Sequence, residues 1–437
     1  DSGYTYRYHL PGIRNKEKEF VVTHKFIGVV TKGDTPPNIV KPGMVLTDAG
    51  LAIGDADSPS LWINPTRKSW DDFDWIRYAC QSADDEDEAI ELLKEVVKMH
   101  APCVSENLFV VGPRKAYVME GDAFRYSVRE IEDILVMSNY PKDLWKYRIM
   151  RRLLIARSFD FEKKEIIRKG SIVRLGGVLG VRIYDIDTKG IYVKLWPVGE
   201  EIRIKCGEGK VVGPFWVEVL DIEGKRAEIR ICYKYKEWEK EIINKLEERY
   251  GKIDVLDLME LSRLQIEDLK GIRGMSEGYN EGTAICKIPY TLYDYLSCLW
   301  FSPNQCSSIY IPVHICCRDI YEAYTNGSAA NLSVEILQLF GRSGFSDYAE
   351  RVEEVFVREV EVVEKIARKL IEKGKDPSLF LTRVDMEMQK QAYLTELFVV
   401  SLKKEGKDIP MLWENNYSST LLRFFLLSKE LDAKYLK

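Results

Sequence analysis

The residues best suited to catalysis lie where apolar runs end. Asn139 follows the apolar run 134–137 and comes two residues before the turn proline Pro141. An amide held at the end of a buried strand can donate a hydrogen bond to a developing oxyanion. A second apolar run ends at Gly54 and Asp55, whose backbone N–H groups are candidates for a second donor. The alternative for Asn139 is a structural role, in which its side chain caps the strand before the turn.

Arg67 is a candidate for substrate binding, because a guanidinium group can hold a substrate carboxylate through two parallel hydrogen bonds. The alternative is an exposed arginine with a structural role only. Five of the nine cysteines lie between residues 286 and 317. No Cys-x-x-Cys pair occurs and His314 is the only histidine nearby, so the spacing does not predict a zinc site. Buried thiols or disulfide bonds are the remaining interpretations.

The composition is that of a globular protein with more than one domain. The chain has 437 residues, with 46% hydrophobic and 30% charged residues, and this length predicts two or three domains. A net charge of −5 gives no general attraction to nucleic acid. We find no apolar run of about 18 residues and therefore expect no membrane span. Abundant Lys, Arg and Glu with little Gln resemble the composition of thermophile proteins.

The first third of the chain is rich in strands. Turn residues 47–50 and 112–115 separate short apolar runs and predict two hairpins. An acidic start at 84–87 followed by 3.6-residue periodicity over 89–98 predicts a helix. Because the strands come in runs and do not alternate with helices, we expect an α+β fold. The expected strands are 20–24, 26–30, 44–46, 50–53, 108–111, 116–120 and 134–137.

The pattern changes after a charged stretch that begins near residue 151. Alternating apolar and polar residues over 170–235 predict a small antiparallel barrel or sandwich. Strands are expected again over 298–317, and the chain from residue 331 onward is expected to be helical. The other expected helices are 237–249, 255–264, 334–340, 348–373, 386–404 and 421–431. We therefore divide the chain into 1–150, an inserted β-rich unit 151–249, a second core part 250–330 and a helical region 331–437.

Several segments, in this order, resemble N-terminal-nucleophile (Ntn) hydrolases. The segment 47–54, T-D-A-G-L-A-I-G, is similar to the N-E-x-G-(L/V)-A-I-G hairpin of that family, and 138–141, S-N-Y-P, is similar to S-(A/N)-N-x-P. The helix and strands over 89–120 and later landmarks at 257–259, 281–283 and 307–312 continue the likeness. The chain is most similar to the branch of dipeptidase A type peptidases, acyl-CoA:6-aminopenicillanate acyltransferases and choloylglycine hydrolases. The resemblance implies an αββα sandwich in which 170–235 is an insertion.

The resemblance also implies a chemistry. In this family a cysteine at the mature amino terminus attacks an amide carbonyl, and its own α-amino group is the base, so no metal or organic cofactor is needed. The implied substrate is a small peptide or N-acyl amide. By the same resemblance Asn139 donates to the oxyanion, and Asp1 matches a carboxylate that orients the amine of the nucleophile. Thr47 stands where the family has the hairpin asparagine.

The sequence begins at Asp1, and the family's first strand with its nucleophilic cysteine is absent from it. Our first expectation is that this strand is missing from the sequence or forms a separate peptide after processing. The second is a catalytically inactive binding or assembly protein on the same fold. The third is a replacement nucleophile, for which Cys103 is the best candidate. The sequence leaves a homo-oligomer open and favours a cytoplasmic over a secreted protein only slightly.

Overall fold

The computed structural model describes residues 5–9, 17–30, 42–58, 60, 62–66, 69–144, 162–175, 179–276 and 282–407. These residues form helices and antiparallel sheets, which confirms the expected α+β class. Within these ranges, none of the helices has the length and apolar character needed to span a membrane.

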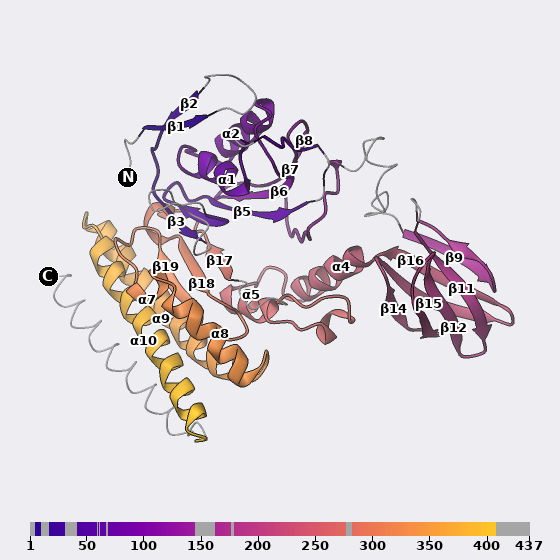
Figure 1. The fold of residues 1–437 in the computed structure, drawn as a ribbon. Coiled ribbons are helices and arrows are strands. Elements are labelled where there is room, and N and C mark those ends of the chain that lie inside the picture. The colour runs from indigo at the N-terminus through magenta and orange to yellow at the C-terminus, as the bar shows by residue number, and fades with distance from the viewer. Residues whose placement is uncertain are drawn as a thin grey trace.

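The N-terminal part is built around a six-stranded antiparallel meander (Figure 1). As expected, the segments 47–50 and 112–115 are hairpin turns. Gly50 adopts a φ of +75° in the first of them, a conformation that glycine adopts without strain. The strands are β3 (Phe26–Val29), β4 (Met44–Thr47), β5 (Ala52–Asp57), β6 (Glu106–Val111), β7 (Ala116–Gly121) and β8 (Tyr126–Glu130), and β1 (Thr5–His9) pairs with β2 (Glu17–Val21) in a separate sheet.

The prediction of a strand at 134–137 is wrong, because these residues have irregular backbone structure. Ile131 still donates its N–H to the Ala116 carbonyl beside β8. The chain then leaves the sheet, and Val136 packs against an apolar cluster that includes Trp238. Val136 is therefore partly buried by this cluster and not by strand pairing.

Two helices connect β5 to β6 and cover one face of the meander. They are α1 (Asp72–Cys80) and α2 (Glu86–Lys98). Each helix begins after an aspartate, Asp71 or Asp85, whose carboxylate accepts a backbone N–H of the first turn, as N-cap residues do. Trp75 and Leu93 of these helices share a buried cluster with Leu108 of β6.

A second antiparallel sheet packs on the other face of the meander. Leu46 of β4 lies in one buried cluster with Leu299 and Ile315 of this sheet. The strands are β17 (Thr283–Lys287), β18 (Cys298–Ser302) and β19 (Ile311–His314). The helices behind them are α6 (Tyr293–Leu296), α7 (Glu322–Thr325), α8 (Ser328–Phe340), α9 (Ser346–Glu372) and α10 (Ser378–Lys404).

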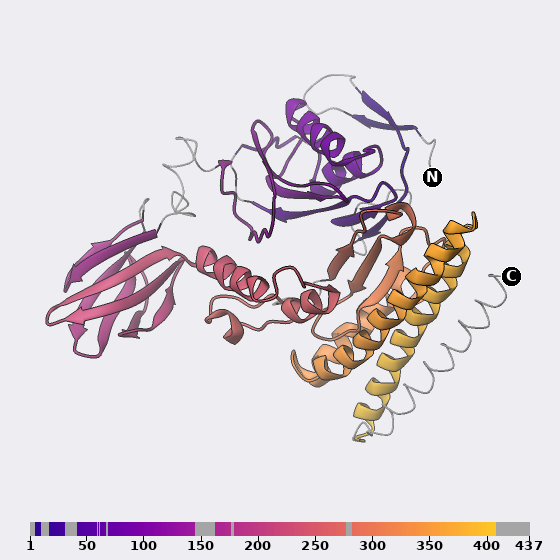
Figure 2. The same cartoon turned by 180° about the vertical axis from the view of Figure 1, so that it is seen from behind.

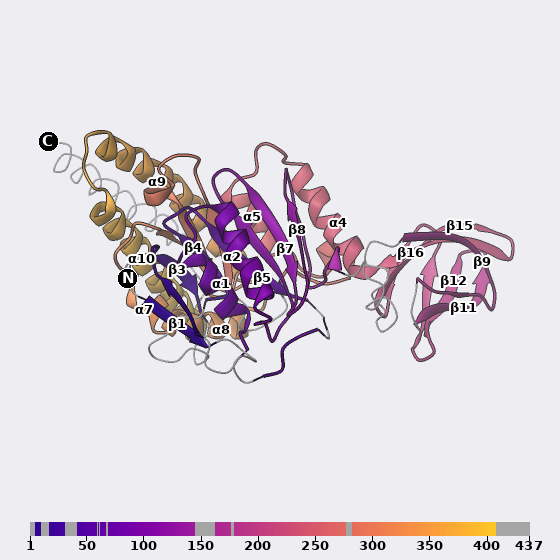
Figure 3. The same cartoon turned by 90° about the horizontal axis from the view of Figure 1, so that it is seen from above.

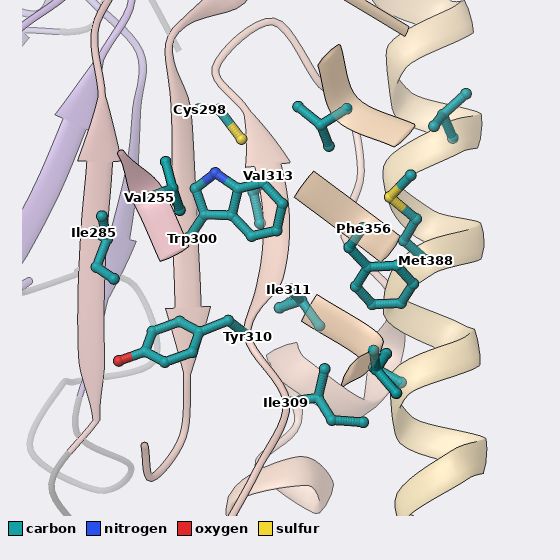
Figure 4. Packing of buried hydrophobic residues seen from close by; sticks show 14 of the residues in the cluster. Val255, Ile285, Cys298, Trp300, Ile309, Tyr310, Ile311, Val313, Phe356 and Met388 are labelled. Atoms are coloured by element: carbon teal, nitrogen blue, oxygen red, sulfur yellow. The ribbon is translucent and has the colours of Figure 1, made fainter. Parts of the chain in front are cut away.

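The main helices of this region lie on the far side of the second sheet. Trp300 and Val313 of the strands belong to the same buried cluster as Phe356 of α9 and Met388 of α10 (Figure 4). The layers therefore run helix, sheet, sheet, helix across the molecule (Figures 1 and 2).

The strands between residues 162 and 233 form a separate β unit with its own hydrophobic cluster. Two four-stranded antiparallel sheets face each other, and the unit projects beyond the layers (Figure 3). Its strands are β9 (Glu162–Arg168), β10 (Ile172–Val173), β11 (Gly180–Asp187), β12 (Gly190–Trp196), β13 (Glu201–Lys205), β14 (Gly209–Val212), β15 (Phe215–Glu223) and β16 (Arg226–Tyr233). The helix α4 (Lys234–Glu247) and then α5 (Val255–Ser262) lead back to the core.

Helix side chains satisfy backbone groups along the outer side of β19 and the residues just before it. In the described ranges β19 pairs with β18 only. Buried backbone donors and acceptors need partners, and four side chains of α9 and α10 provide them here. The pairs are Ile309 N–H with Glu396, Tyr310 N–H with Glu353, His314 N–H with Asp385, and Pro312 C=O with the amide of Gln389, at 2.8, 2.8, 2.6 and 2.9 Å.

Glu353 also forms a buried ion pair with Arg263, which directly follows α5. Both terminal guanidinium nitrogens donate to the carboxylate, at 2.8 and 2.6 Å. Nε of Arg263 donates to the carbonyl oxygen of Gln305 at 2.7 Å. Arg263, Glu353 and Gln305 are all buried, so each charge of the pair needs the other as its counter-ion.

We predict that Glu353→Gln lowers the free energy of unfolding by about 3–5 kcal/mol, because it leaves the Arg263 charge buried without its counter-ion. The matched control is Glu354→Gln on the same helix, which removes an exposed pair with Arg358 and is expected to change stability by less than about 1 kcal/mol. Urea titration of both variants measures the difference. Equal midpoints for the two variants would contradict a structural role for the buried pair.

Candidate functional site

An open pocket of about 420 Å³ lies where β5 ends and β6 begins. Asn139 lines it, together with Cys103 and Glu106. The structure thus brings together two of the residues singled out from the sequence, Asn139 and Cys103. The remaining lining residues are Asp57, Ser58, Ser60, Ile63, Val104, Ser105 and Tyr140.

The backbone that carries Asn139 is held by two buried side chains. Glu239 of α4 accepts hydrogen bonds from both the N–H and the hydroxyl of Ser138, at 2.8 and 3.1 Å. The amide of Asn107 in β6 donates to the Ser138 carbonyl at 3.2 Å. Asn139 itself is exposed, so an anchored backbone presents an accessible amide to the pocket.

The chain is anchored again just beyond Pro141. Glu120 of β7 accepts the backbone N–H groups of three consecutive residues, at 2.7, 2.6 and 2.9 Å. On the other side, the ring of Tyr140 contacts those of Tyr233 and Tyr235, with centroids 4.8 and 5.1 Å apart. The turn that bears Asn139 is therefore fixed by the sheet and by the start of α4. The three residues bound by Glu120 are Lys142, Asp143 and Leu144.

Four carboxyl groups gather at the same end of the sheet. Glu106 lies directly opposite Asp57 in the β5–β6 ladder, and Asp55 is on the same face two residues earlier. Asp72, the first residue of α1, is close enough to Asp55 for their side chains to interact. In the described part of the chain, no lysine or arginine pairs with any of the four.

Glu106 has the most unusual environment of the four. Its side chain is fully buried, and neither carboxylate oxygen accepts a hydrogen bond. Burial, followed by the charges of Asp55 and Asp57, raises the pKa of Glu106 to about 11. Burial and then Asp72 likewise raise the pKa of Asp55. Glu106 is therefore a neutral acid at pH 7 that can donate a proton or a hydrogen bond to a ligand.

The structure separates Thr47 from this pocket. Thr47 is buried in the β4–β5 hairpin, where its hydroxyl accepts the Leu51 N–H at 3.2 Å. The strand from Ala52 to Asp57 runs from this hairpin to the pocket. At the usual rise per residue its length is about 17 Å. Thr47 therefore serves the hairpin and lies far from Asn139.

Gly54 lies inside β5, where it is paired with Met44 on one side and Phe109 on the other. Its backbone belongs to the ladder of the sheet, and it does not line the pocket. The carboxyl group of Asp55, rather than its N–H, is the part that belongs to the site. Asp1 and Arg67, which the sequence also singled out, lie outside the described residues.

Sequence reasoning missed Glu106, Asp57 and Asp72 as site residues. Glu106 shares a face of β6 with the apolar Leu108 and Val110, and this break in the apolar pattern was the available signal. Their proximity depends on a pairing between residues 49 positions apart. Comparison with protein-family models and with curated proteins found no match to this chain.

Glu106→Gln is expected to stabilise the protein at pH 7 by about 1–3 kcal/mol, because the unfolded state no longer gains by ionising this group. The sign follows from the raised pKa of Glu106. The contribution of Glu106 to wild-type stability falls as pH rises above about 4.3, where the unfolded glutamate ionises, and continues to fall toward the folded pKa. Thermal melts at pH 5, 7 and 9 should therefore diverge, with the variant gaining most at pH 9.

The matched control is Glu120→Gln in the adjacent strand. This glutamate is also buried, but it accepts three backbone N–H groups. Its loss is expected to destabilise the protein by about 1–3 kcal/mol. If both variants were destabilised alike, Glu106 would be an ordinary satisfied core residue.

Proposed function

We propose that this chain is the scaffold of an N-terminal-nucleophile type amidohydrolase that cleaves a peptide or N-acyl amide bond in the pocket of Asn139. The observation that carries the proposal is the exposed Asn139 amide on a backbone anchored by Glu239 and Asn107. An oxyanion donor must be accessible and must not need to reorganise during the reaction. The helix, sheet, sheet, helix order supports the same αββα fold.

The carboxyl groups favour a substrate with a positive charge. Asp57 lines the pocket beside the neutral Glu106, and no cationic side chain of the described residues pairs with Asp57. A peptide or amide with a free amino group would supply that charge, and its ammonium can hydrogen-bond to the Asp57 carboxylate. We therefore propose amino-bearing peptides or amides as the substrate class.

The nucleophile is the open part of the proposal. Cys103 lines the pocket, but no histidine or lysine does, and a cysteine nucleophile needs such a base or cation to form its thiolate. In the described ranges β17 pairs with β18 only, so its outer edge can accept an added strand. A strand carrying a terminal cysteine and its α-amine would supply the nucleophile and its base.

The rival is a non-catalytic binding or assembly protein on the same fold. The absence of a nucleophile–base pair among the described pocket residues favours it. Amine release from a panel of dipeptides and N-acyl amides, with and without a free amino group, distinguishes the two. Turnover supports the amidohydrolase, and binding without turnover by the native protein supports the rival.

In an active preparation, Asn139→Ala is expected to lower turnover about 100-fold or more, because it removes one donor to the oxyanion. The melting temperature should stay within a few degrees of wild type, since the exposed side chain contributes little to packing. Asn326→Ala is the control, an exposed asparagine next to α8 that is expected to leave turnover unchanged. Equal turnover in the Asn139 variant and wild type would end the oxyanion assignment.

A further inference from the structure

A second cluster of reactive side chains lies between the second sheet and the helices, outside the pocket. His314 ends β19, Cys317 follows on the next turn, and Asp385 projects from α10. Nδ1 of His314 is 3.0 Å from both carboxylate oxygens of Asp385, and Sγ of Cys317 is 3.1 Å from Oδ2. One nitrogen, one sulfur and one oxygen thus lie within 4.8 Å of one another.

We propose that His314, Cys317 and Asp385 bind a zinc ion. Imidazole nitrogen, thiolate sulfur and carboxylate oxygen are the ligand types that zinc uses in proteins. With zinc bond lengths of about 2.0–2.3 Å, neighbouring ligand atoms of a tetrahedral site are about 3.3–3.5 Å apart. The Nδ1–Oδ1 and Sγ–Oδ2 separations of 3.0 and 3.1 Å need to widen by a few tenths of an ångström, and Nδ1 and Sγ lie within 4.8 Å of each other.

The backbone fixes two of the ligands relative to each other. Cys317 donates its N–H to the His314 carbonyl at 2.9 Å, which closes a turn that brings both side chains to one side. Asp385 accepts the His314 N–H at 2.6 Å, so the third ligand is tied to the same residue. The three candidate ligands are therefore held together across β19 and α10.

The outer nitrogen of His314 has the surroundings expected of a metal-binding imidazole. Nε2 is buried and has no hydrogen-bond partner. Glu364 of α9 places Oε1 3.9 Å from it, and Lys287 of β17 holds that carboxylate at 3.1 Å. Imidazoles that bind metal through one nitrogen usually donate the other N–H to a carboxylate or carbonyl, and a small rotation of the ring would complete this bond.

Cys317 also gives solvent a route to the cluster. Its side chain is partly exposed, whereas His314 and Asp385 are fully buried. An ion that enters beside the thiol would connect the second sheet to the helical layer. Binding to the folded state alone would then raise the melting temperature with zinc concentration.

The test uses the full chain, treated with a chelator and then dialysed against zinc or cobalt(II). We expect about one zinc per chain by elemental analysis, a zinc-dependent rise in melting temperature, and a near-ultraviolet thiolate-to-cobalt band. Cys317→Ser should abolish the band, and Glu364→Gln should weaken zinc binding about 10-fold or more. Cys286→Ser is the matched control, a thiol of the same sheet that packs with the cluster between the two sheets.

The result that would overturn the proposal is equally specific. If Cys317→Ser and Asp385→Asn retain as much zinc as wild type and Cys286→Ser, the metal is bound elsewhere. If the wild-type chain binds no zinc and shows no cobalt band, the cluster is only a hydrogen-bonded part of the core. Cys317 is partly exposed, so we expect Cys317→Ser to fold. If Asp385→Asn does not fold, Cys317→Ser alone still tests the proposal.

Discussion

The packing of the second sheet depends on the hydrogen bonds that the backbone groups on the outer side of β19 make with helix side chains. In the described ranges no strand pairs with this side of β19. Carboxylates of α9 and α10 accept backbone N–H groups here and an amide of α10 donates to a backbone carbonyl, as a neighbouring strand would. Apolar packing alone could slide the helices along the sheet, whereas each of these hydrogen bonds is made at one register only. Glu353 and Asp385 thereby fix the helical layer, and Glu353 also compensates Arg263. The same constraint places Asp385 beside His314 and Cys317.

The first sheet contains a buried polar side chain whose oxygens have no hydrogen-bond donor. Glu106 and Glu120 are buried glutamates on neighbouring strands, and only Glu120 has donors for its oxygens. A buried acid without partners opposes folding, and such groups in native proteins are concentrated at sites that bind or react. The contrast between the two residues is the physical reason for placing the candidate site at the Glu106 end of the sheet.

The sequence predicted well those elements that local pattern determines. The turn 47–50, the acidic start of α2 and the periodic helix α9 all depend on residues a few positions apart. The strand prediction for 134–137 failed because Val136 packs against a cluster of distant residues that includes Trp238 of α4, and this packing cannot be read from the local pattern. Asn139 was found because an amide before a turn proline is a local signal.

The rest of the site was not predictable because it depends on distant pairings. Glu106 lies beside Asp57 only because β5 and β6 pair in the sheet. The contact between His314 and Asp385 joins residues 71 positions apart. The spacing of cysteines and histidines gave no zinc signal, since the carboxylate ligand comes from a helix that follows much later. Thr47 illustrates the opposite error, because a motif likeness placed it in a site that β5 separates from it.

The junction between the β unit and the core has a mechanical consequence. Strand β16 ends at Tyr233 and α4 begins at Lys234, with no linker between them. Arg230 of the strand binds Glu237 of the helix at 2.6 Å, which stiffens the joint. Two residues further on, Glu239 accepts the backbone N–H of Ser138, beside Asn139. The β unit is thus joined without a linker to the helix that holds the backbone of Ser138, so a rotation of the unit about this junction would act on the residue next to Asn139.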